Sequence, residues 1–227
     1  MPLALAHRGD WSDAPENTLA AFAAAERAGA DLIELDIRLT ADGELAVLHD
    51  PTLERVWGLP RAVAETALAD VRALRSGEHG IPTLTEALDA VSAGVMVDYT
   101  TADVVEPALD AIRAAGALDR CLFSGANVGG HRRIRELEPD ARIALTWTRE
   151  ERPPAQLLDD LQVEFFNPPY HLVEPGVVEA MHERGLKVST WTVDDPAEMR
   201  RVIDAGVDAV ITNRIAELVA LLAEARC

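Results

Sequence analysis

The sequence has few cysteines and no long apolar run. Two cysteines, Cys121 and Cys227, are too few for a disulfide framework. No stretch approaches the ~18–20 apolar residues that cross a bilayer, and residues 1–6 lack the basic region that opens a secretory signal peptide. These absences argue against a secreted or membrane-spanning protein. We therefore expect a cytoplasmic protein with no stable membrane association.

Basic residues are scarce as well. The chain has 21 lysines and arginines against 39 aspartates and glutamates, which gives a net charge of −18 at pH 7. Such a field repels nucleic acid and anionic lipid surfaces, so we expect neither as a partner. It also repels phosphate esters. A phosphate-processing site in this chain must therefore supply positive charge locally, from a cation and an arginine.

Short apolar runs alternate with helical patterns through the whole chain. The alternation predicts a parallel sheet covered by helices, and eight strand–helix units in 227 residues fit a (β/α)8 TIM barrel. Since no linker interrupts the pattern, we expect a single domain over residues 1–227. The expected barrel strands are residues 3–7, 31–37, 95–99, 121–124, 143–147, 163–166, 188–192 and 209–212. The expected helices are residues 17–27, 62–74, 83–92, 103–115, 128–138, 154–161, 174–184, 195–204 and 214–225.

A β-hairpin is predicted directly after the second strand. Residues 40–43, with the sequence Thr-Ala-Asp-Gly, are a turn signal, and residues 44–49 read as the returning strand. Because about as many residues return from the turn as lead into it, we expect His49 to lie level with Asp36. The irregular segment 51–92 is predicted to form a small helical insertion.

Carboxylates point into the expected barrel. Glu34 and Asp36 alternate with the outward-facing apolar residues of the second strand and therefore face the interior. Asp98 is likewise an acid in an otherwise apolar strand. Buried acids require compensation by a cation or an arginine, and oxygen ligands suit a hard divalent cation such as Mg²⁺ or Ca²⁺. The alternative is a salt-bridged acidic pair near the barrel rim.

Two histidines follow strands that are expected to end at the same rim. Cleavage of a phosphodiester needs a base for the attacking oxygen and an acid for the leaving alkoxide, and imidazoles serve both purposes near neutral pH. His7 and His49 are placed for these roles. The alternative for each is a hydrogen-bonded structural histidine. We expect the remaining histidines to be surface residues, with one of them placed to line a pocket, namely His171; the others are His79, His131 and His182.

Three further residues are candidates for substrate binding. Arg8 is placed to grip phosphate oxygens through two N–H groups, or alternatively to form a salt bridge with Glu34 or Glu16. Glu16 either reaches the site or favours the start of the first helix through charge–dipole attraction. Trp191, at a strand end, is either a core residue or a wall for the alcohol part of a substrate.

A series of motifs spans nearly the whole chain in a fixed order. They are His7-Arg8-Gly9, Pro15-Glu16-Asn17-Thr18, Glu34-Leu35-Asp36, Thr40-Ala41-Asp42-Gly43, His49-Asp50, Ile81-Pro82-Thr83-Leu84, Trp191-Thr192-Val193 and Gly206-Val207-Asp208-Ala209-Val210-Ile211-Thr212. This series resembles that of the glycerophosphodiester phosphodiesterases, and its N-terminal motifs are the most specific. The resemblance implies a TIM barrel that hydrolyses glycerophosphodiesters to sn-glycerol 3-phosphate and an alcohol, with a bound Ca²⁺ or Mg²⁺.

The resemblance also implies residue roles. His7 and His49 would be the acid/base pair, Glu34 and Asp36 metal ligands, and Arg8 the phosphate-binding residue. The 2-hydroxyl of the glycerol would attack first, and water would then open the cyclic phosphate.

This sequence departs from the family pattern on the third barrel strand. A glutamate and, two residues later, a lysine are usual there, whereas this chain has Asp98 and Thr100. Asp98 retains a carboxylate for the metal, but Thr100 cannot supply the lysine's charge to the phosphate. Loss of such a contact removes about 1.5–3 kcal/mol of binding or transition-state stabilisation. The serine–phenylalanine pair usual after the fourth strand is also altered, to Phe123-Ser124-Gly125.

Three other functions remain open from the sequence. One is a barrel that binds phosphoesters with weak or lost turnover, because Thr100 replaces the usual lysine. Another is a related lysophospholipase D-type enzyme, against which the acidic charge and the lack of an amphipathic anchor argue. The third is a purely structural barrel, which would leave the shared rim of acids and histidines unexplained.

Overall fold

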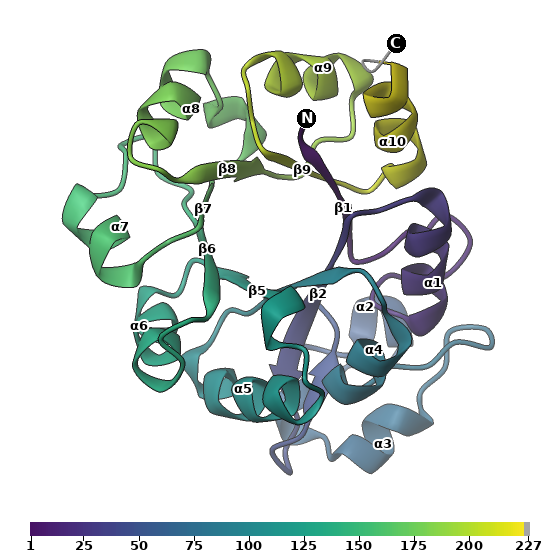
Figure 1. Ribbon diagram of the computed structural model, residues 1–227. Helices are drawn as coiled ribbons and strands as arrows, with labels where there is room; N and C mark the ends of the chain where they lie inside the picture. Colours follow the sequence, from purple (N-terminus) through teal and green to yellow (C-terminus); the bar gives the residue numbers. More distant parts are fainter. Residues whose placement is uncertain (225–227) are drawn as a thin grey trace.

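Eight parallel strands form a closed barrel in the computed structural model, which describes residues 1–224 (Figure 1). The ring runs β1-β9-β8-β7-β6-β5-β4-β2 and closes because β1 pairs with both β2 and β9. The predicted TIM barrel is thus confirmed. Its strands are β1 (Leu3–His7), β2 (Leu32–Leu39), β4 (Gly94–Asp98), β5 (Cys121–Gly125), β6 (Arg142–Thr146), β7 (Phe165–Asn167), β8 (Lys187–Thr190) and β9 (Ala209–Thr212).

Helices cover the outside of this ring (Figure 1). They are α1 (Leu19–Ala28), α4 (Leu84–Ala90), α5 (Val105–Ala114), α6 (Val128–Leu137), α7 (Ala155–Leu161), α8 (Pro175–His182), α9 (Pro196–Asp204) and α10 (Ile215–Glu224), with the 3₁₀ turns η2 (Ala102–Val104), η3 (Leu118–Arg120) and η4 (Tyr170–Leu172). None of the described helices is long and apolar enough to cross a membrane. The predicted last residue of the C-terminal helix, Ala225, and also Cys227 lie outside the described residues.

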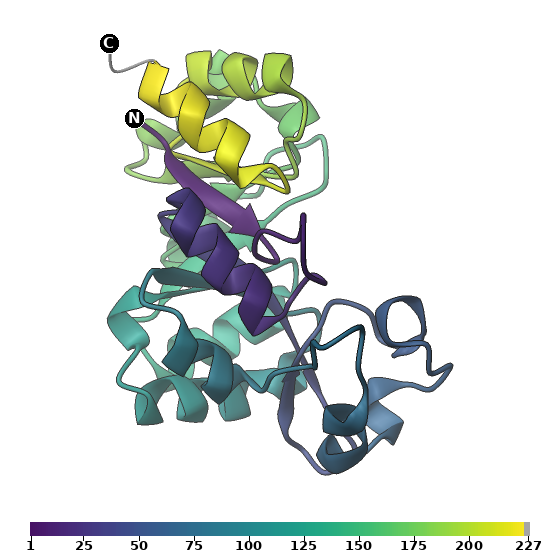
Figure 2. The same ribbon diagram turned by 90° about the vertical axis from the view of Figure 1, so that its right-hand side faces the viewer.

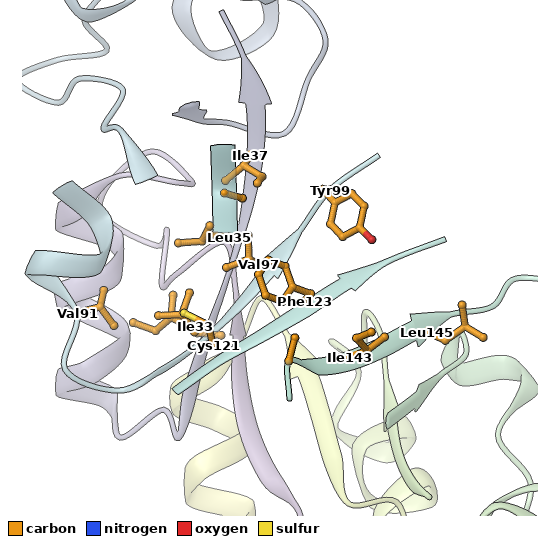
Figure 3. Close-up of a cluster of buried hydrophobic side chains, with 14 of the residues drawn as sticks. Ile33, Leu35, Ile37, Val91, Val97, Tyr99, Cys121, Phe123, Ile143 and Leu145 are labelled. Atoms are coloured by element: carbon orange, nitrogen blue, oxygen red, sulfur yellow. The ribbon is translucent and has the colours of Figure 1, made fainter. Parts of the chain in front are cut away.

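The two faces of β2 serve different purposes. Ile33, Leu35 and Ile37 point outward into the large core between strands and helices (Figure 3). Leu32 points inward, where it packs with side chains such as Met96 and Phe165 in the barrel interior. Because successive strand residues face opposite sides, Glu34 and Asp36 share the inward face above Leu32, as the sequence predicts.

Both ends of the first helix are capped. The Thr18 hydroxyl accepts a hydrogen bond from the Ala21 N–H at 3.3 Å, and Gly29 ends α1 in a left-handed conformation with φ 90°. Gly9, also left-handed, lies so close to α1 that an added Cβ would be 2.7 Å from the Ala21 backbone carbon. The chain that leaves β1 therefore fits against α1 only with glycine at this position.

The hairpin after β2 forms as predicted. Strand β3 (Leu45–Val47) lies outside the ring and pairs antiparallel with β2, with Val47 opposite Ile37. Beyond it, the Leu48 N–H donates to the Asp36 carbonyl at 3.0 Å. The hairpin therefore returns the chain to the level of Asp36 just before His49.

The insertion after β3 differs in part from the prediction. It contains α2 (Glu54–Trp57), η1 (Val63–Glu65) and α3 (Leu68–Ala73), and its own apolar cluster includes Trp57. Figure 2 shows it (blue) projecting at the end of the barrel toward which the arrow of β1 points.

The single helix predicted for residues 62–74 is wrong. Thr66 and Ala67 are extended and separate η1 from α3. The Asp42 carboxylate accepts the Leu68 N–H at 2.9 Å, and this contact from the hairpin turn caps α3 at its start. A tertiary contact thus decides where this helix begins.

Candidate active site

A cavity of about 180 Å³ lies at the carboxyl end of the barrel strands. The end of β1 contributes His7, whose Cα is paired with that of Glu34 on β2. Asp36, within β2, is paired with Asp98, the last residue of β4. The side chains that line the cavity are those of His7, Arg8, Glu34, Asp36, His49, Met96, Asp98, Ser124, Thr146, Asn167, Trp191 and Ile211. Function in TIM barrels lies at this end of the strands.

Three carboxylates meet at one point of this cavity. Each of Glu34, Asp36 and Asp98 offers an oxygen atom within 4.8 Å of the others. Burial raises the pKa of Glu34 well above its usual value, and the charges of Asp36 and Asp98 raise it further. Burial, together with Asp36, raises the pKa of Asp98 to about 7. The three carboxylates repel one another when ionised, and a bound cation would relieve this repulsion.

The acidic cluster fits a hard divalent cation. Asp98 Oδ1 is buried and has no hydrogen-bond partner among the described residues, although buried polar atoms are normally paired. All the ligand atoms are carboxylate oxygens, which suit Mg²⁺ or Ca²⁺ rather than the nitrogen and sulfur sets of zinc. Glu34, Asp36 and Asp98 are therefore able to hold a metal ion together.

Arg8 is held rigidly beside this cluster. Its backbone is left-handed, with φ 61°, a conformation that is rare for residues other than glycine and marks functional sites. In this conformation its N–H donates to Glu34 Oε2 at 2.9 Å. The guanidinium Nη1 donates to Glu16 Oε1 at 2.9 Å, and Nε lies 3.3 Å from Asp36 Oδ2 without hydrogen-bond geometry. Arg8 thus brings one fixed positive charge to the mouth.

His7 has a neutral partner. Its Nδ1 lies 2.7 Å from Asn213 Oδ1, and the Asn213 amide nitrogen donates to Asp194 Oδ2 at 2.7 Å. This second hydrogen bond orients the Asn213 oxygen toward His7, so Nδ1 carries the proton and Nε2 is left to accept one. Burial and the neighbouring Arg8 lower the pKa of His7, despite the opposing effect of Asn213.

His49 has a charged partner. Its Nδ1 lies 2.7 Å from Asp50 Oδ1. Arg55 donates from Nε to Asp50 Oδ2 at 2.5 Å and from Nη1 and Nη2 to the two oxygens of Glu16 at 2.9 and 2.7 Å. The hydrogen bond from Arg55 is the main cause that lowers the pKa of Asp50 to about 2. A permanent carboxylate therefore supports the His49 imidazole.

A second arginine faces the cluster from β2. Arg38 lies two residues beyond Asp36 on the same strand face. Burial lowers the pKa of Arg38 below its ordinary value. The charges of three nearby acids oppose this effect without cancelling it, namely those of Asp36, Asp50 and Asp98. Its Nη1 donates to the Thr100 hydroxyl at 3.3 Å.

The rest of the cavity wall includes hydroxyl, amide and indole groups. Asn167 Nδ2 donates to Thr146 Oγ1 at 3.1 Å, and the Thr146 hydroxyl lies 3.4 Å from that of Ser124. The Trp191 indole N–H donates to the Asn167 carbonyl at 3.2 Å, which fixes the ring against the cavity. This wall is neutral and suits a polyol or an alcohol.

The structure brings most of the residues predicted from the sequence into one cavity. Two of the candidates, Glu16 and Thr100, do not line it but bond to residues at its mouth. The expectation that His131 lies on the surface is wrong. It is fully buried, because its ring bridges the Tyr99 hydroxyl and the Gly125 carbonyl, each at 2.8 Å. His171 is exposed and does not line the cavity.

Sequence reasoning missed the supporting residues Asn213, Asp194, Arg55 and Arg38. Asn213 directly follows the last barrel strand, and this position alone was the available signal. Arg55 lies in an insertion without regular periodicity, and its link to Glu16 spans 39 residues.

A cluster of three acids able to hold a cation shares this cavity with two imidazoles and an arginine. These are the groups that a phosphoric diester hydrolase needs. Residues 7–217 match the Glycerophosphoryl diester phosphodiesterase family. The chain belongs to this family of phosphoric diester hydrolases, as its motifs predict.

Individual relatives agree with this assignment. The chain is 32% identical to a glycerophosphodiester phosphodiesterase of Caldanaerobacter subterraneus, with 93% of each chain covered. It is 31% identical to a probable glycerophosphodiester phosphodiesterase of Mycobacterium tuberculosis, over 93% of this chain and 87% of the relative. An Oleispira antarctica phosphodiesterase, solved with the product sn-glycerol-3-phosphate, has the same fold with a TM-score of 0.92 and 23% identity over 98% of this chain and 97% of that one.

Proposed function

We propose that this protein hydrolyses glycerophosphodiesters to sn-glycerol 3-phosphate and an alcohol, with one divalent cation, Mg²⁺ or Ca²⁺, as cofactor. The observation that carries the proposal is the cavity of about 180 Å³ in which two histidines, Arg8 and three carboxylates meet. Family membership and the product found in the Oleispira antarctica relative support the substrate class. The net charge of −18 favours a small soluble diester over an anionic lipid surface, in keeping with a cytoplasmic enzyme.

The acids and Arg8 are proposed to hold the phosphate end of the substrate. Glu34, Asp36 and Asp98 would bind the cation, which supplies Lewis-acid stabilisation of the phosphate charge when bound. The Arg8 guanidinium adds a second, fixed positive charge next to Asp36. Glu16 and Asp36 orient Arg8 and make it rigid before substrate arrives.

The neutral wall is proposed to hold the organic part of the substrate. Trp191 offers an indole face, while Ser124 and Thr146 offer hydroxyl groups that can bond to a glycerol. A wall of this kind binds sugar-like hydroxyls without adding charge to a site that already contains three acids.

His7 is proposed as the base of the first step. With Nδ1 donating to Asn213, its Nε2 is free to take the proton from the 2-hydroxyl of the glycerol. The hydroxyl oxygen attacks phosphorus and forms a cyclic phosphate. The lowered pKa of His7 keeps its imidazole neutral, and therefore ready to accept this proton, at neutral pH.

His49 is proposed as the acid of the first step. The ionised Asp50 stabilises an imidazolium at His49, which gives its proton to the leaving alkoxide as the phosphorus–oxygen bond breaks. Water then opens the cyclic phosphate with the two roles reversed, because His49 now accepts a proton and His7 returns one. Both imidazoles end the cycle in their starting states.

Turnover of glycerophosphocholine and glycerophosphoethanolamine, with enzymatic detection of sn-glycerol 3-phosphate, tests this function. We expect activity in the wild type and a loss of roughly 10²- to 10⁴-fold in His7→Ala and in His49→Ala, as is usual for a general acid or base. His182→Ala is the matched control, since that imidazole is exposed on α8 and bonded to Asp208. Wild-type rates in either variant would remove that residue from its role.

A binding measurement with sn-glycerol 3-phosphate and a turnover assay with lysophospholipids separate the other functions. Binding of sn-glycerol 3-phosphate with no turnover would mean a phosphoester-binding barrel. Cleavage of intact lysophospholipids in preference to the soluble diesters would mean a lysophospholipase D-type enzyme. Either outcome would overturn the proposed substrate class.

A further inference from the structure

Arg38 is a half-buried cation beside the cavity, and among the described residues no ion pair neutralises its charge. It does not itself line the cavity, but it bonds to the backbone of His49, which does. The ion pairs near the mouth belong to Arg8 and Arg55. In the described part of the chain, no carboxylate oxygen lies within the 4.0 Å of a salt bridge to Arg38. Yet Asp36, Asp50 and Asp98 are all close enough for their charges to act on it. A chain of net charge −18 thus has, within its described residues, an arginine without a salt bridge beside the cluster of three acids.

Two hydrogen bonds fix the guanidinium across the mouth. Its Nε donates to the His49 carbonyl at 2.6 Å, which ties Arg38 to the hairpin. Its Nη1 donates to the Thr100 hydroxyl at 3.3 Å, which ties it to the segment that follows Asp98. Nη2 has no hydrogen-bond partner among residues 1–224. The arginine is therefore anchored by two of its nitrogens and retains donor capacity at the third.

Arg8 alone offers little free charge to an anion. Its guanidinium already bonds to Glu16 and lies against Asp36. A phosphate that enters beside three carboxylates meets strong repulsion, which a cation and a paired arginine relieve only in part. Arg38 lies two residues beyond Asp36, next to Thr100, and its guanidinium is anchored and free of a carboxylate partner. A guanidinium of this kind is suited to bind an oxyanion.

We propose that Arg38 binds a non-bridging phosphate oxygen of the substrate from the side of Thr100, and so supplies the positive charge that position 100 lacks. This inference rests on the proposed phosphodiester substrate. The neutral hydroxyl of Thr100 serves as an acceptor that aims the guanidinium. The charge thus reaches the mouth from β2 rather than from the end of β4.

This role changes the expectation for Thr100→Lys. Because Thr100 cannot supply the charge of the lysine usual in the family, a lysine at position 100 would be expected to raise turnover if phosphate charge were limiting. With Arg38 already there, the new ammonium would face a like charge and displace the hydrogen bond to Thr100. We expect no gain in the single variant. In an Arg38→Gln background, the same lysine has no cationic neighbour and should restore the lost binding.

Calorimetric binding of sn-glycerol 3-phosphate in the presence of Mg²⁺ tests the proposal directly. We expect Arg38→Gln to weaken binding by about 10- to 100-fold, as for loss of one charge-assisted contact, and Arg38→Lys to weaken it less. Arg27→Gln is the control, because Arg27 is exposed in the last turn of α1, at the opposite end of the barrel. Unchanged affinity in Arg38→Gln would overturn the proposal.

The double variant Arg38→Gln/Thr100→Lys distinguishes two roles of Arg38: supplying positive charge to the phosphate, or only holding the His49 backbone in place. If Arg38 acts through its charge, the lysine restores affinity at least tenfold relative to Arg38→Gln. If Arg38 only holds the His49 backbone, the lysine restores nothing, and the proposal is wrong. Binding is measured apart from turnover, so a wild type that binds sn-glycerol 3-phosphate but hydrolyses no diester would refute the enzymatic function and not this contact.

Discussion

The two imidazoles at the mouth have opposite kinds of partner at Nδ1. His7 donates to a neutral amide, that of Asn213, whereas His49 faces the carboxylate of Asp50. A carboxylate stabilises an imidazolium, and an amide fixes the tautomer without favouring the charge. This asymmetry is the reason for assigning the base to His7 and the acid to His49.

Removal of the amide partner tests this assignment. We expect Asn213→Ala to reduce kcat/KM by roughly 10- to 100-fold, since the His7 tautomer is no longer fixed. The hydrogen bond that His7 donates to Asn213 raises the pKa of His7, so its loss lowers this pKa and moves the acidic limb of the pH–rate profile to lower pH. An acidic limb that stays in place, measured from pH 4 to 9, would contradict the role of Asn213.

The acidic cluster makes a prediction for the metal-free protein. The pKa of Asp98 is raised to about 7, so between its ordinary value and pH 7 the folded state binds the extra proton, and stability falls as the pH rises through this window. Asp98→Asn removes one charge of the cluster. We expect it to stabilise the EDTA-treated protein by roughly 2 kcal/mol above pH 7, measured by urea unfolding, and to abolish the stabilisation that added Mg²⁺ gives the wild type. A destabilised metal-free variant would argue against mutual repulsion.

Two elements carry most of the site. Strand β2 presents Glu34, Asp36 and Arg38 along one face, and the hairpin that follows it places His49 beside them. This arrangement was predictable, because strand alternation sets the face and the lengths of the hairpin arms set the level of His49. Arg38 follows from the same alternation, but its hydrogen bonds to His49 and Thr100 arise only in the folded chain.

Helix α6 is joined to the barrel by a buried histidine. His131 bridges Tyr99, just beyond β4, and Gly125 at the end of β5. An added Cβ at Gly130 would be 2.6 Å from the Tyr99 ring, so the ring packs against bare backbone. Sequence reasoning placed His131 at the surface because it lies in a predicted helix outside the barrel strands. Its burial depends on partners 32 and 6 residues away.

The buried histidine predicts a loss of stability in acid. Burial lowers the pKa of His131 to about 4. Between about pH 6.5 and pH 4, the unfolded state therefore binds a proton at this histidine and the folded state does not. The free energy of unfolding therefore decreases by roughly 3 kcal/mol as the pH falls from about 6.5 toward 4. Urea unfolding at pH 7.5 and pH 4.5 should show a smaller loss in His131→Phe than in the wild type. His182→Ala should keep the full loss, and an equal loss in His131→Phe would show that His131 is not its source.

At the scale of the whole molecule, the sequence predicts the fold well because a TIM barrel is built from local repeats. Each strand–helix unit has its own apolar pattern, so the order of elements is visible without knowledge of contacts. The site is less visible, because its supporting residues are distant in sequence. Asn213 lies 206 residues from His7. No pattern in the local sequence predicts a contact over such a separation.

The distribution of charge links the whole molecule to its substrate. A chain of net charge −18 has Arg8 in the wall of the cavity that holds its acidic cluster, and Arg38 beside that cavity, bonded to His49 and Thr100. The overall repulsion of anions is therefore offset locally, at the mouth of this cavity. We expect the substrate KM to fall modestly as ionic strength rises, since salt screens the long-range repulsion before it weakens the short contacts. A KM that rises steeply from low salt would indicate a surface that attracts the substrate instead.

The most direct measurement is phosphorus NMR of a glycerophosphodiester incubated with protein freed of metal by chelation, before and after one divalent cation is restored. We predict no turnover without the cation and, after addition of Mg²⁺ or Ca²⁺, growth of the sn-glycerol 3-phosphate resonance in the wild type but not in the Glu34→Gln variant. Undiminished hydrolysis in the chelated protein would contradict a reaction that depends on a cation held by Glu34, Asp36 and Asp98.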